Sequence, residues 1–520
     1  MLDNVANLVL LVGLLAAHFD FDATFALRYM IPPTALGVLA GDLALTWMAF
    51  RLARRTGNNS VTAMSLGLDT PSTFGMVFFV LGPAYQAALA QGLETTEAAL
   101  YAWQIGTCAI IVSGFFKLGC AGVSHWVRQV IPRAGLLGSL AAIALVLISF
   151  LPLFEILRHP VVGFVSLGII LTTLVARVRA PLRVPGALAA LLAGGCVFYA
   201  MRAAGYIEPE PSPLNPAEGL LPLGWLEAFR FGWTEAFRDS LHYLPVVIPF
   251  ALATVVGGID CTESAAAAGD DYPTGQIIAV EALATLLAGF CGGVIQTTPY
   301  IGHPAYKAMG GRAAYTLATA LVVGSAGLLG YFGYMYAVIP KAAIFPILIF
   351  VGLEITAQSF HATPRRHYVA VGLACVPAMA SLVMIHADQL LAAAGTSIEA
   401  LAEQPQSLLL AQTLQTVRIL SGGFIVTSLL WASALAALVD RRLLRGAVFF
   451  GVAALASLFG VVHSPLAGNP LVIPWDMPDL PAAAHGQTPL HMAAGYALLA
   501  VLLVAWAWWA KPQPLDDVNS

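Results

Sequence analysis

Two short stretches decide how this chain folds. Residues 67–75 read Gly-Leu-Asp-Thr-Pro-Ser-Thr-Phe-Gly, and residues 296–304 read Gln-Thr-Thr-Pro-Tyr-Ile-Gly-His-Pro. Each interrupts an apolar run and sets a threonine before a proline. Threonine is a favourable N-cap, proline is favoured at the first helical position, and the residue before proline is pushed towards an extended conformation. Each stretch therefore predicts an extended piece followed by a short helix that begins inside the run. The expected capping residues are Asp69, Thr70, Pro71, Thr297 and Pro299.

The spacing and direction of the two stretches indicate an internal repeat. The two Thr-Pro pairs lie 298 − 70 = 228 residues apart, close to the separation of the two halves of the chain. The first run is directed from inside to outside and the second from outside to inside, as in transporters with inverted repeats and broken helices at the midplane. A single Thr-Pro pair would instead suggest an ordinary helix capped at the membrane surface. Two pairs at matching positions in opposed halves favour the inverted repeat.

The composition excludes a soluble enzyme. Of 520 residues, 59% are hydrophobic and only 10% are charged, with a mean hydropathy of +0.81. Soluble domains carry about 25% charged residues. Apolar runs of the length that spans a bilayer, roughly 20 residues, recur from residue 4 to residue 510. The chain is therefore expected to be an all-α polytopic membrane protein.

Sixteen apolar runs divide the chain into four parts. They predict a 7+7 inverted-repeat transporter fold, in which the third and tenth spans are strand-plus-half-helix elements, followed by two extra C-terminal transmembrane helices. The expected parts are a first seven-span repeat at 1–203, an extracytoplasmic connector at 204–240, a second seven-span repeat at 241–438, and the extra spans with a short cytosolic tail at 439–520.

Basic residues in the loops orient these spans. With the N-terminus in the cytosol, alternate loops should be rich in Lys and Arg, and they are, whereas the intervening loops are acidic or nearly neutral. Sixteen spans place both termini in the cytosol, so the expected location is the plasma membrane, which is the inner membrane in a bacterium. The basic loops contain Arg51, Arg54, Arg55, Arg128, Arg133, Arg177, Arg179, Arg183, Lys307, Arg312, Arg365, Arg366, Arg441, Arg442 and Arg445.

Two carboxylates lie within the eighth run. Asp260 and Glu263 are three residues apart, so they share one helix face. Ionisable groups inside a span are costly and by default face a cavity in which they function. Because two nearby acids repel, at least one should bind a proton more readily, and we predict that both bind substrate and carry a coupling proton. Alternatively, Glu263 lies near the cytosolic interface and only caps or pairs with a loop.

Other ionisable residues within the runs are weaker candidates. His303 could titrate near neutral pH and take part in proton coupling, or it could be a structural histidine bonded to a carbonyl. Asp42 is expected to pair with a neighbouring span. Glu281 and Lys117 are expected at the membrane interface.

Several classes of function lack their motifs. The chain has no Walker motif, no H-E-x-x-H and no G-x-S-x-G, and none of its six cysteines forms a CxxC pair. ATP-driven pumping, intramembrane catalysis and zinc or cluster binding are therefore not expected. We expect no enzymatic activity, no cofactor, no metal and no nucleic-acid partner.

The stretch 260–269, followed by Thr297 and Thr298, resembles the nucleobase–ascorbate (xanthine/uracil) permease family. The resemblance extends from the first span to about residue 437. It implies seven plus seven inverted spans, divided into a core domain and a gate domain, with strand-plus-helix elements as the third and tenth spans. Asp260 takes the position of the family's substrate-binding glutamate and is one methylene shorter. The family's second carboxylate is missing here, because its position falls near Ile301.

The resemblance and the buried acids together predict a secondary active permease for proton-coupled uptake of a nucleobase or similar small heterocycle. Na⁺ is left open as the coupling ion. The expected partners are the small solute and membrane lipid, and a homodimer is left open. Asp260 would bind ring N–H groups, while Phe74 or Tyr300 would stack on the ring. The predicted substrate site contains Asp260, Glu263, Ser72, Thr73, Phe74, Thr298, Tyr300, Ile301 and Gly302, and the predicted proton-coupling residues are Asp260, Glu263 and His303.

Two other functions are left open by the sequence. An anion transporter of the sulfate/bicarbonate type has the same fold, and the N-termini of half-helices attract anions, although Asp260 works against anion binding. A channel or a non-transporting scaffold is the third class, but it would leave the buried carboxylate without a purpose.

Overall fold

The computed structural model describes residues 1–130, 133–181, 184–208, 215–300, 302–466, 471, 474 and 489–509. The described part is almost entirely helical. The chain forms two compact units. The first comprises residues 1–127 and 148–351, and the second comprises residues 128–147 and 352–520.

The described helices confirm a polytopic membrane protein. Ten are long and apolar enough to cross a membrane by length and composition, and two bent pairs raise this number to 12. Three shorter apolar helices and one strand-plus-half-helix complete the correspondence with the sixteen runs found in the sequence. The shorter apolar helices are Pro160–Val175, Thr274–Phe290 and Leu443–Leu458.

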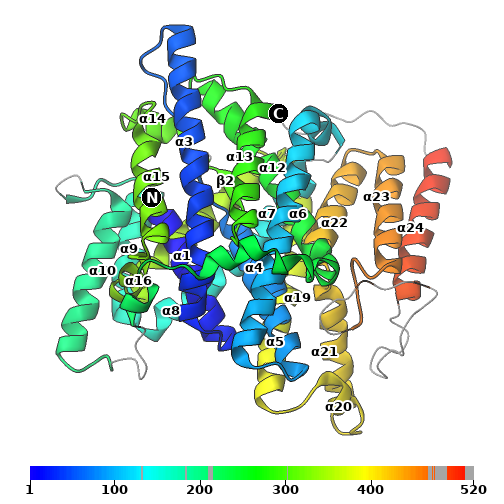
Figure 1. Cartoon of the computed structure of the whole chain (residues 1–520). Coiled ribbons are helices and arrows are strands. Elements are labelled where there is room, and N and C mark those ends of the chain that lie inside the picture. Colours follow the sequence, from blue (N-terminus) through cyan, green and yellow to red (C-terminus); the bar gives the residue numbers. More distant parts are fainter. Residues whose placement is uncertain are drawn as a thin grey trace. The chain divides into compact units, whose positions relative to one another are not determined.

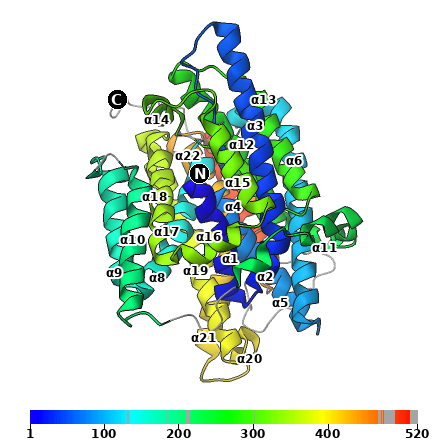
Figure 2. The same ribbon diagram turned by 60° about the vertical axis from the view of Figure 1, so that its left-hand side comes forward.

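The first unit holds both predicted breaks (Figures 1 and 2). Its helices and strands are α1 Leu2–Phe19, α2 Ala23–Phe25, α3 Ile31–Thr56, β1 Leu66–Leu68, α4 Thr70–Met76, α5 Gly82–Ala90, α6 Thr95–Val130, α8 Phe150–Arg158, α9 Pro160–Ile170, α10 Gly186–Ala203, α11 Phe237–Ser240, α12 Leu244–Ala267, α13 Thr274–Phe290, β2 Thr297–Pro299, α14 His303–Ala308, α15 Tyr315–Leu328, α16 Phe332–Val338 and α17 Lys341–Ile344. Three helical elements contain boundaries between the units, namely α6, the π-helix η3 (Ala144–Ser149) and α18 (Pro346–His361).

The two predicted extended pieces pair with each other. Strands β1 and β2 are antiparallel, with Gly67 opposite Thr298 at the centre of the register. Each strand leads into a helix: β1 into α4, which continues through a π-helical turn into α5, and β2 into α14. Figure 1 shows β2 beside α12 and α13. The strand-plus-half-helix arrangement of the third and tenth spans is confirmed, and so is the inverted repeat, because antiparallel pairing sends the two helices off in opposite senses.

The exact helix starts differ from the prediction. Asp69 is the N-cap of α4, since its Oδ2 accepts a 2.9 Å hydrogen bond from the Ser72 N–H, and Thr70 is the first helical residue. In the second half, Pro299 lies in β2, and the helix begins only at His303. Proline is tolerated at such an edge position because it has no N–H to leave unpaired. The strand register therefore pairs Gly67 with Thr298. Helix α4 begins at Thr70, soon after Gly67, whereas α14 begins later after Thr298, at His303.

Small residues let the helices around the strands approach closely. A Cβ on Gly37 of α3 would lie 2.8 Å from the Ala288 Cβ of α13, and one on Gly327 of α15 would lie 2.3 Å from the Ala35 Cβ of α3. Small-residue contacts of this kind drive helix packing within membranes. Helix α3 is thereby held between α13 and α15, next to the strand pair.

The second unit contains a third break. Its helices are α7 Arg133–Ile143, α19 Tyr368–Ala393, α20 Ile398–Ala402, α21 Leu408–Ser421, α22 Phe424–Val439, α23 Leu443–Leu458 and α24 Pro489–Trp509. Helices α21 and α22 meet at an angle of 71°. Gly423, at the bend, has φ +64°, which is a conformation that only glycine adopts without strain.

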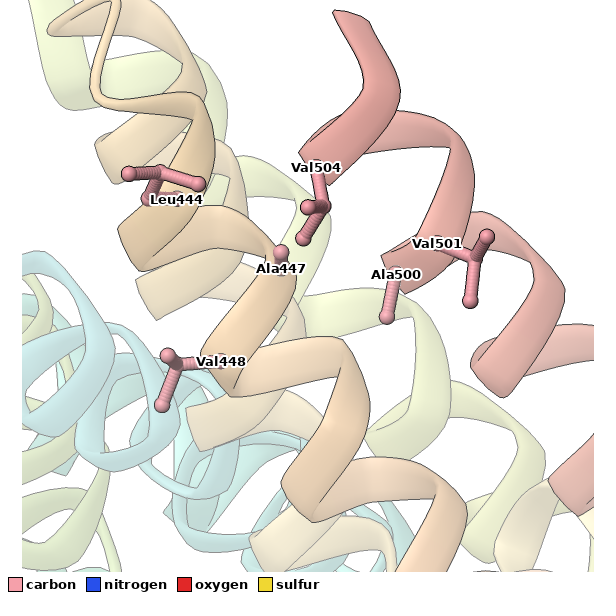
Figure 3. A pocket seen from close by; sticks show the side chains of 6 residues that line it. All are labelled: Leu444, Ala447, Val448, Ala500, Val501 and Val504. Carbon is pink, nitrogen blue, oxygen red and sulfur yellow. The ribbon is translucent and has the colours of Figure 1, made fainter. Parts of the chain in front are cut away.

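The two extra C-terminal spans are present as α23 and α24, which pack along each other (Figure 1). A groove between them is lined only by aliphatic side chains (Figure 3), so it offers nothing that could select a polar solute. Its lining residues are Leu444, Ala447, Val448, Ala500, Val501 and Val504.

Candidate functional site

The outer edge of β1 is satisfied by polar side chains of α1 and α3. A strand inside an apolar unit must find partners for every N–H that points away from its neighbouring strand. The Leu66 N–H donates to the Asp42 Oδ1 at 2.8 Å, and the Leu68 N–H donates to the Asn4 Oδ1 at 2.8 Å. Asp42 and Asn4 are both wholly buried. The expected pairing of Asp42 with a neighbouring span is therefore a bond to the backbone of the third span.

The outer edge of β2 is satisfied in the same way from the other side. The Thr297 N–H donates to the Thr285 Oγ1 at 3.2 Å, and the Thr297 carbonyl accepts a 2.7 Å hydrogen bond from the Lys117 Nζ. The Pro299 carbonyl accepts a 3.4 Å contact from the Cys261 thiol of α12. The strand pair is thus held by α6, α12 and α13 as well as by α1 and α3.

Lys117 and Glu281 form an ion pair in the interior of the first unit. Their Nζ and Oε1 atoms lie 2.7 Å apart, and both side chains are 0% exposed. The expectation that these residues lie at the membrane interface is wrong. A lone charge in an apolar run is hard to distinguish from a run boundary, and the partner lies on a helix far along the sequence.

A chain of hydrogen bonds links the two breaks behind the strands. The Ser113 hydroxyl donates to the Gln296 Oε1 at 2.6 Å, and the Gln296 Nε2 donates to the Asp69 Oδ2 at 3.5 Å. The Asp69 N–H donates to the Gln296 carbonyl at 3.1 Å. Asp69, the N-cap of α4, is therefore tied to the residue that precedes β2.

The side chains at the start of α4 are engaged within the protein. The hydroxyls of Ser72 and Thr73 both donate to the Asp69 carbonyl, at 3.1 and 2.9 Å. Phe74 is fully buried, and its ring stacks on that of Phe78 with 6.4 Å between the centroids. These three predicted substrate-binding side chains therefore serve the local packing of the half-helix.

Tyr300 is held across the strand pair. Its hydroxyl bonds to the Asp3 carboxylate and lies 3.3 Å from the Asn4 Oδ1. A Cβ on Gly67 would lie 2.3 Å from the Tyr300 ring, so only glycine leaves room for the ring on β1. The Tyr300 hydroxyl therefore contacts α1, and its ring packs on β1.

The other predicted site residues are less closely gathered. Asp260 and Glu263 are half-buried on α12, one helical turn apart, while Cys261 of the same helix faces β2. Thr298 and Gly302 are half-buried at β2 and just before α14. Ile301 lies outside the described residues.

His303 belongs to a cluster around the wholly buried carboxylate of Asp270. The His303 Nε2 lies 2.9 Å from one oxygen of this carboxylate, which also accepts from the Thr62 N–H at 3.1 Å, and the Lys307 Nζ lies 2.7 Å from the other oxygen. Burial alone would raise the pKa of Asp270, but the hydrogen bonds from Lys307, His303 and Thr62 hold this pKa below its usual value. The cluster ties α14 to the loop before β1 and to the loop after α12.

Three backbone N–H groups at the starts of the half-helices have no hydrogen-bond acceptor among the described residues. Among the described residues, no carbonyl or side chain accepts a hydrogen bond from the N–H of Thr70, Gly302 or His303. Thr70 and His303 are buried residues, at 3% and 1% exposed. Buried backbone N–H groups in proteins are nearly always paired. The starts of α4 and α14 therefore offer donors, reinforced by the positive ends of two helix dipoles, to an acceptor that is not part of the described chain.

The described residues offer no metal site, since none of their His, Cys, Asp and Glu side chains gather in groups of three or more that could hold an ion. Among these residues, the polar groups around the strand pair instead hold the backbone of the two strands.

Comparison with known proteins gives structural matches only. No family model and no curated sequence matches the chain. The transmembrane domain of a cyanobacterial bicarbonate transporter, BicA, matches with a TM-score of 0.41 and 14% identity, over 70% of this chain and 96% of that one. A structure of SLC26A9 matches with a TM-score of 0.46 and 12% identity, over 74% of this chain and 61% of that one.

A further match is the murine SLC26A9 anion transporter in its inward-facing state, with a TM-score of 0.36 and 12% identity, over 68% of this chain and 64% of that one. The chain thus covers less than two thirds of either SLC26A9 structure. The expected membership of the nucleobase–ascorbate permease family is wrong, because these matching structures belong to anion transporters.

Proposed function

We propose that this membrane protein is a secondary transporter of a small anion, which binds between the starts of α4 and α14. The observation that carries the proposal is the set of N–H groups at Thr70, Gly302 and His303 for which the described residues provide no acceptor. Helix N-termini bind anions through such groups and through the helix dipole. Two half-helices that start at one strand pair supply this binding from both sides.

The contacts of the aromatic residues favour a small anion over a flat heterocycle. A ring-shaped solute would need an aromatic face on which to stack. Phe74 is fully buried against Phe78, and the Tyr300 ring is packed over Gly67. Phe74 is therefore closed to a solute, and the Tyr300 hydroxyl and one side of its ring are occupied by α1 and β1, whereas the backbone donors need only an acceptor.

Lys117 supports the same conclusion through its charge. Its ammonium is bonded to the Thr297 carbonyl and brings a positive charge into the strand that leads to α14. When its ion-pair partner Glu281 is protonated, this charge opposes the repulsion that Asp260, half-buried on α12, would exert on an anion. In a medium of low dielectric constant, one such charge is felt over several ångströms.

A flux assay in proteoliposomes tests the proposal. Purified protein is reconstituted, and the uptake of labelled sulfate, chloride, bicarbonate and uracil is measured against concentration. We expect saturable uptake of at least one of the three anions and none of uracil above that of empty liposomes. Saturable uracil uptake without anion uptake would contradict the proposal.

A further inference from the structure

The Lys117–Glu281 pair leaves one carboxylate oxygen unused. Glu281 Oε1 lies 2.7 Å from the Lys117 Nζ, whereas Oε2 accepts no hydrogen bond from the described residues. The hydroxyl of Thr254 is within hydrogen-bonding reach of the Glu281 carboxylate, but its proton is donated to the Ala251 carbonyl at 2.9 Å. A wholly buried carboxylate with a bare oxygen is costly when ionised, and a proton on Oε2 removes that cost.

The chain makes room for Oε2 on the side of α12. A Cβ on Gly258 would lie 3.0 Å from the Glu281 Oε2 and 3.9 Å from the Pro299 Cδ. The absence of a side chain at residue 258 therefore places Oε2 between α12 and β2, two residues before Asp260. Oε2 is thus directed towards the helix that borders the proposed anion site.

We propose that Glu281 Oε2 is the proton-binding atom that couples anion transport to the proton gradient, with Lys117 as the charge through which proton and anion are linked. This inference rests on the proposed function. While Glu281 is ionised, the pair is neutral. When Oε2 takes a proton from water, the carboxylate becomes a neutral acid, and Lys117 remains as an uncompensated positive charge bonded to the Thr297 carbonyl.

The other acidic side chains near the Lys117–Glu281 pair are engaged elsewhere or belong to α12. Asp42 Oδ1 of α3 accepts a hydrogen bond from the Leu66 N–H, and Asp69 Oδ2 accepts one from the Ser72 N–H. Asp260 of α12 is half-buried, and the thiol of Cys261 contacts the Pro299 carbonyl. Among the described residues that surround Lys117, Glu281 is the acid that forms an ion pair with it.

Linkage between the two ligands follows from this arrangement. A neutral Glu281 leaves a net positive charge beside β2, which favours an anion at the start of α14. A bound anion in turn favours the protonated form of Glu281, because binding free energies are reciprocal. One proton and one anion then move together.

The test uses accumulation in proteoliposomes at zero membrane potential, with labelled sulfate and chloride as separate probes. For one proton per anion, an inward gradient of about one pH unit should sustain about tenfold accumulation. Wild-type protein should reach this level. Glu281→Gln, a neutral mimic of the acid form, should still carry the anion but accumulate none. Bicarbonate is left out of this accumulation test, because CO2 diffusing through the bilayer brings it to the same ratio of about tenfold without any transporter.

The matched control is Asp42→Asn, which changes another wholly buried acid beside the strands and keeps an oxygen for the Leu66 N–H. It should accumulate the anion like wild type. If Glu281→Gln also accumulates the anion about tenfold, or if wild type transports it without accumulation, the inference is wrong and the proposed function stands. If wild type transports none of the three anions, the proposed function itself is wrong.

A second measurement covers the case in which Glu281→Gln does not fold. Adding the transported anion to purified wild-type protein in weakly buffered detergent solution should take up about one proton per bound anion, since linkage requires equal coupling in both directions. A protein-free blank corrects for the anion's own protonation. Anion binding without proton uptake would overturn the inference.

Discussion

Two of the regions in which the chain breaks its helices satisfy the freed backbone with different chemistry. At β1 and β2 of the first unit, the partners include charged groups, namely Asp42 and Lys117. At the bend between α21 and α22 of the second unit, they are neutral. The His463 N–H donates to the Gly422 carbonyl at 2.9 Å, and the His463 Nδ1 lies 3.1 Å from the Ile419 carbonyl.

The neutral break shows that charges are not needed to support irregular backbone in this protein. His463 is wholly buried, and its Nε2 lies 2.7 Å from the Tyr496 hydroxyl, which also accepts from the Trp431 Nε1. The backbone freed at the bend between α21 and α22 is thus bound by His463 of loop 459–466, which Tyr496 of α24 holds in turn. Buried charges are more costly than buried neutral groups, so the Lys117–Glu281 ion pair beside β2 indicates a function beyond support.

The largest expected effect comes from removing one member of the charged pair. Lys117→Met should destabilise the protein by about 3–5 kcal/mol, because it leaves Glu281 as a buried charge without a partner. Lys117→Met combined with Glu281→Leu should recover most of this loss. Thermal unfolding of the purified variants measures both effects, and a single variant as stable as the double variant would show that the pair is not ionic.

The neutral break should respond to backbone geometry instead. Gly423→Ala places a Cβ 2.1 Å from the Val461 carbonyl oxygen at φ +64°, and should cost at least about 1–3 kcal/mol. The KM for the anion should stay at the wild-type value in the fraction that folds. A changed KM with unchanged unfolding temperature would place the anion site elsewhere.

Asp270→Asn should reveal how the free energy of unfolding depends on pH through the buried carboxylate that binds His303 and Lys307 of α14. Because the pKa of Asp270 lies below its usual value of 3.8, its ionised form stabilises the fold above that pH. This contribution is lost as the pH falls through the folded-state pKa. The variant should be less stable by about 1–3 kcal/mol at neutral pH.

Unfolding measured from pH 7 to pH 3 should show the difference between wild type and Asp270→Asn shrinking only at the acid end. A difference that is constant over this whole range would mean that the charge of Asp270 contributes nothing.

The smallest effect is expected from Tyr496→Phe in the second unit. It removes the hydroxyl shared by His463 and Trp431, at a cost of about 1–3 kcal/mol for groups left unsatisfied. Anion uptake per folded molecule should not change. Loss of uptake without loss of stability would give the neutral break a role in transport.

Much of the fold could be predicted because it depends on local patterns. Apolar runs predicted the spans, and Pro71 and Pro299 marked both breaks. The exact helix starts could not be predicted, since Pro299 suits the edge of a strand as well as the start of a helix. Asp69 rather than Thr70 proved to be the N-cap of α4.

The candidate site was harder to predict because its parts come from distant spans. Lys117 and Glu281 each looked like the end of an apolar run, and only the fold brings them to 2.7 Å. Phe74 and Tyr300 have the chemistry of a stacking site, but packing against Phe78 and Gly67 uses their rings. The Thr-Pro pairs predicted the half-helix starts that carry the backbone donors, but only the fold shows which of these N–H groups have no acceptor among the described residues.

The central claim is that the N–H groups at the starts of α4 and α14 bind the anion. Thr70→Pro, compared with Thr70→Val, tests it most directly. Both variants lose the hydroxyl, and only the proline, which is well suited to a first helical position, also removes the N–H that no described group accepts. Anion binding to the purified Thr70→Pro variant should weaken about tenfold relative to Thr70→Val, as expected for one lost charge-assisted hydrogen bond of about 1.5 kcal/mol, while the unfolding temperature stays the same. Unchanged affinity in a folded Thr70→Pro protein would contradict the claim.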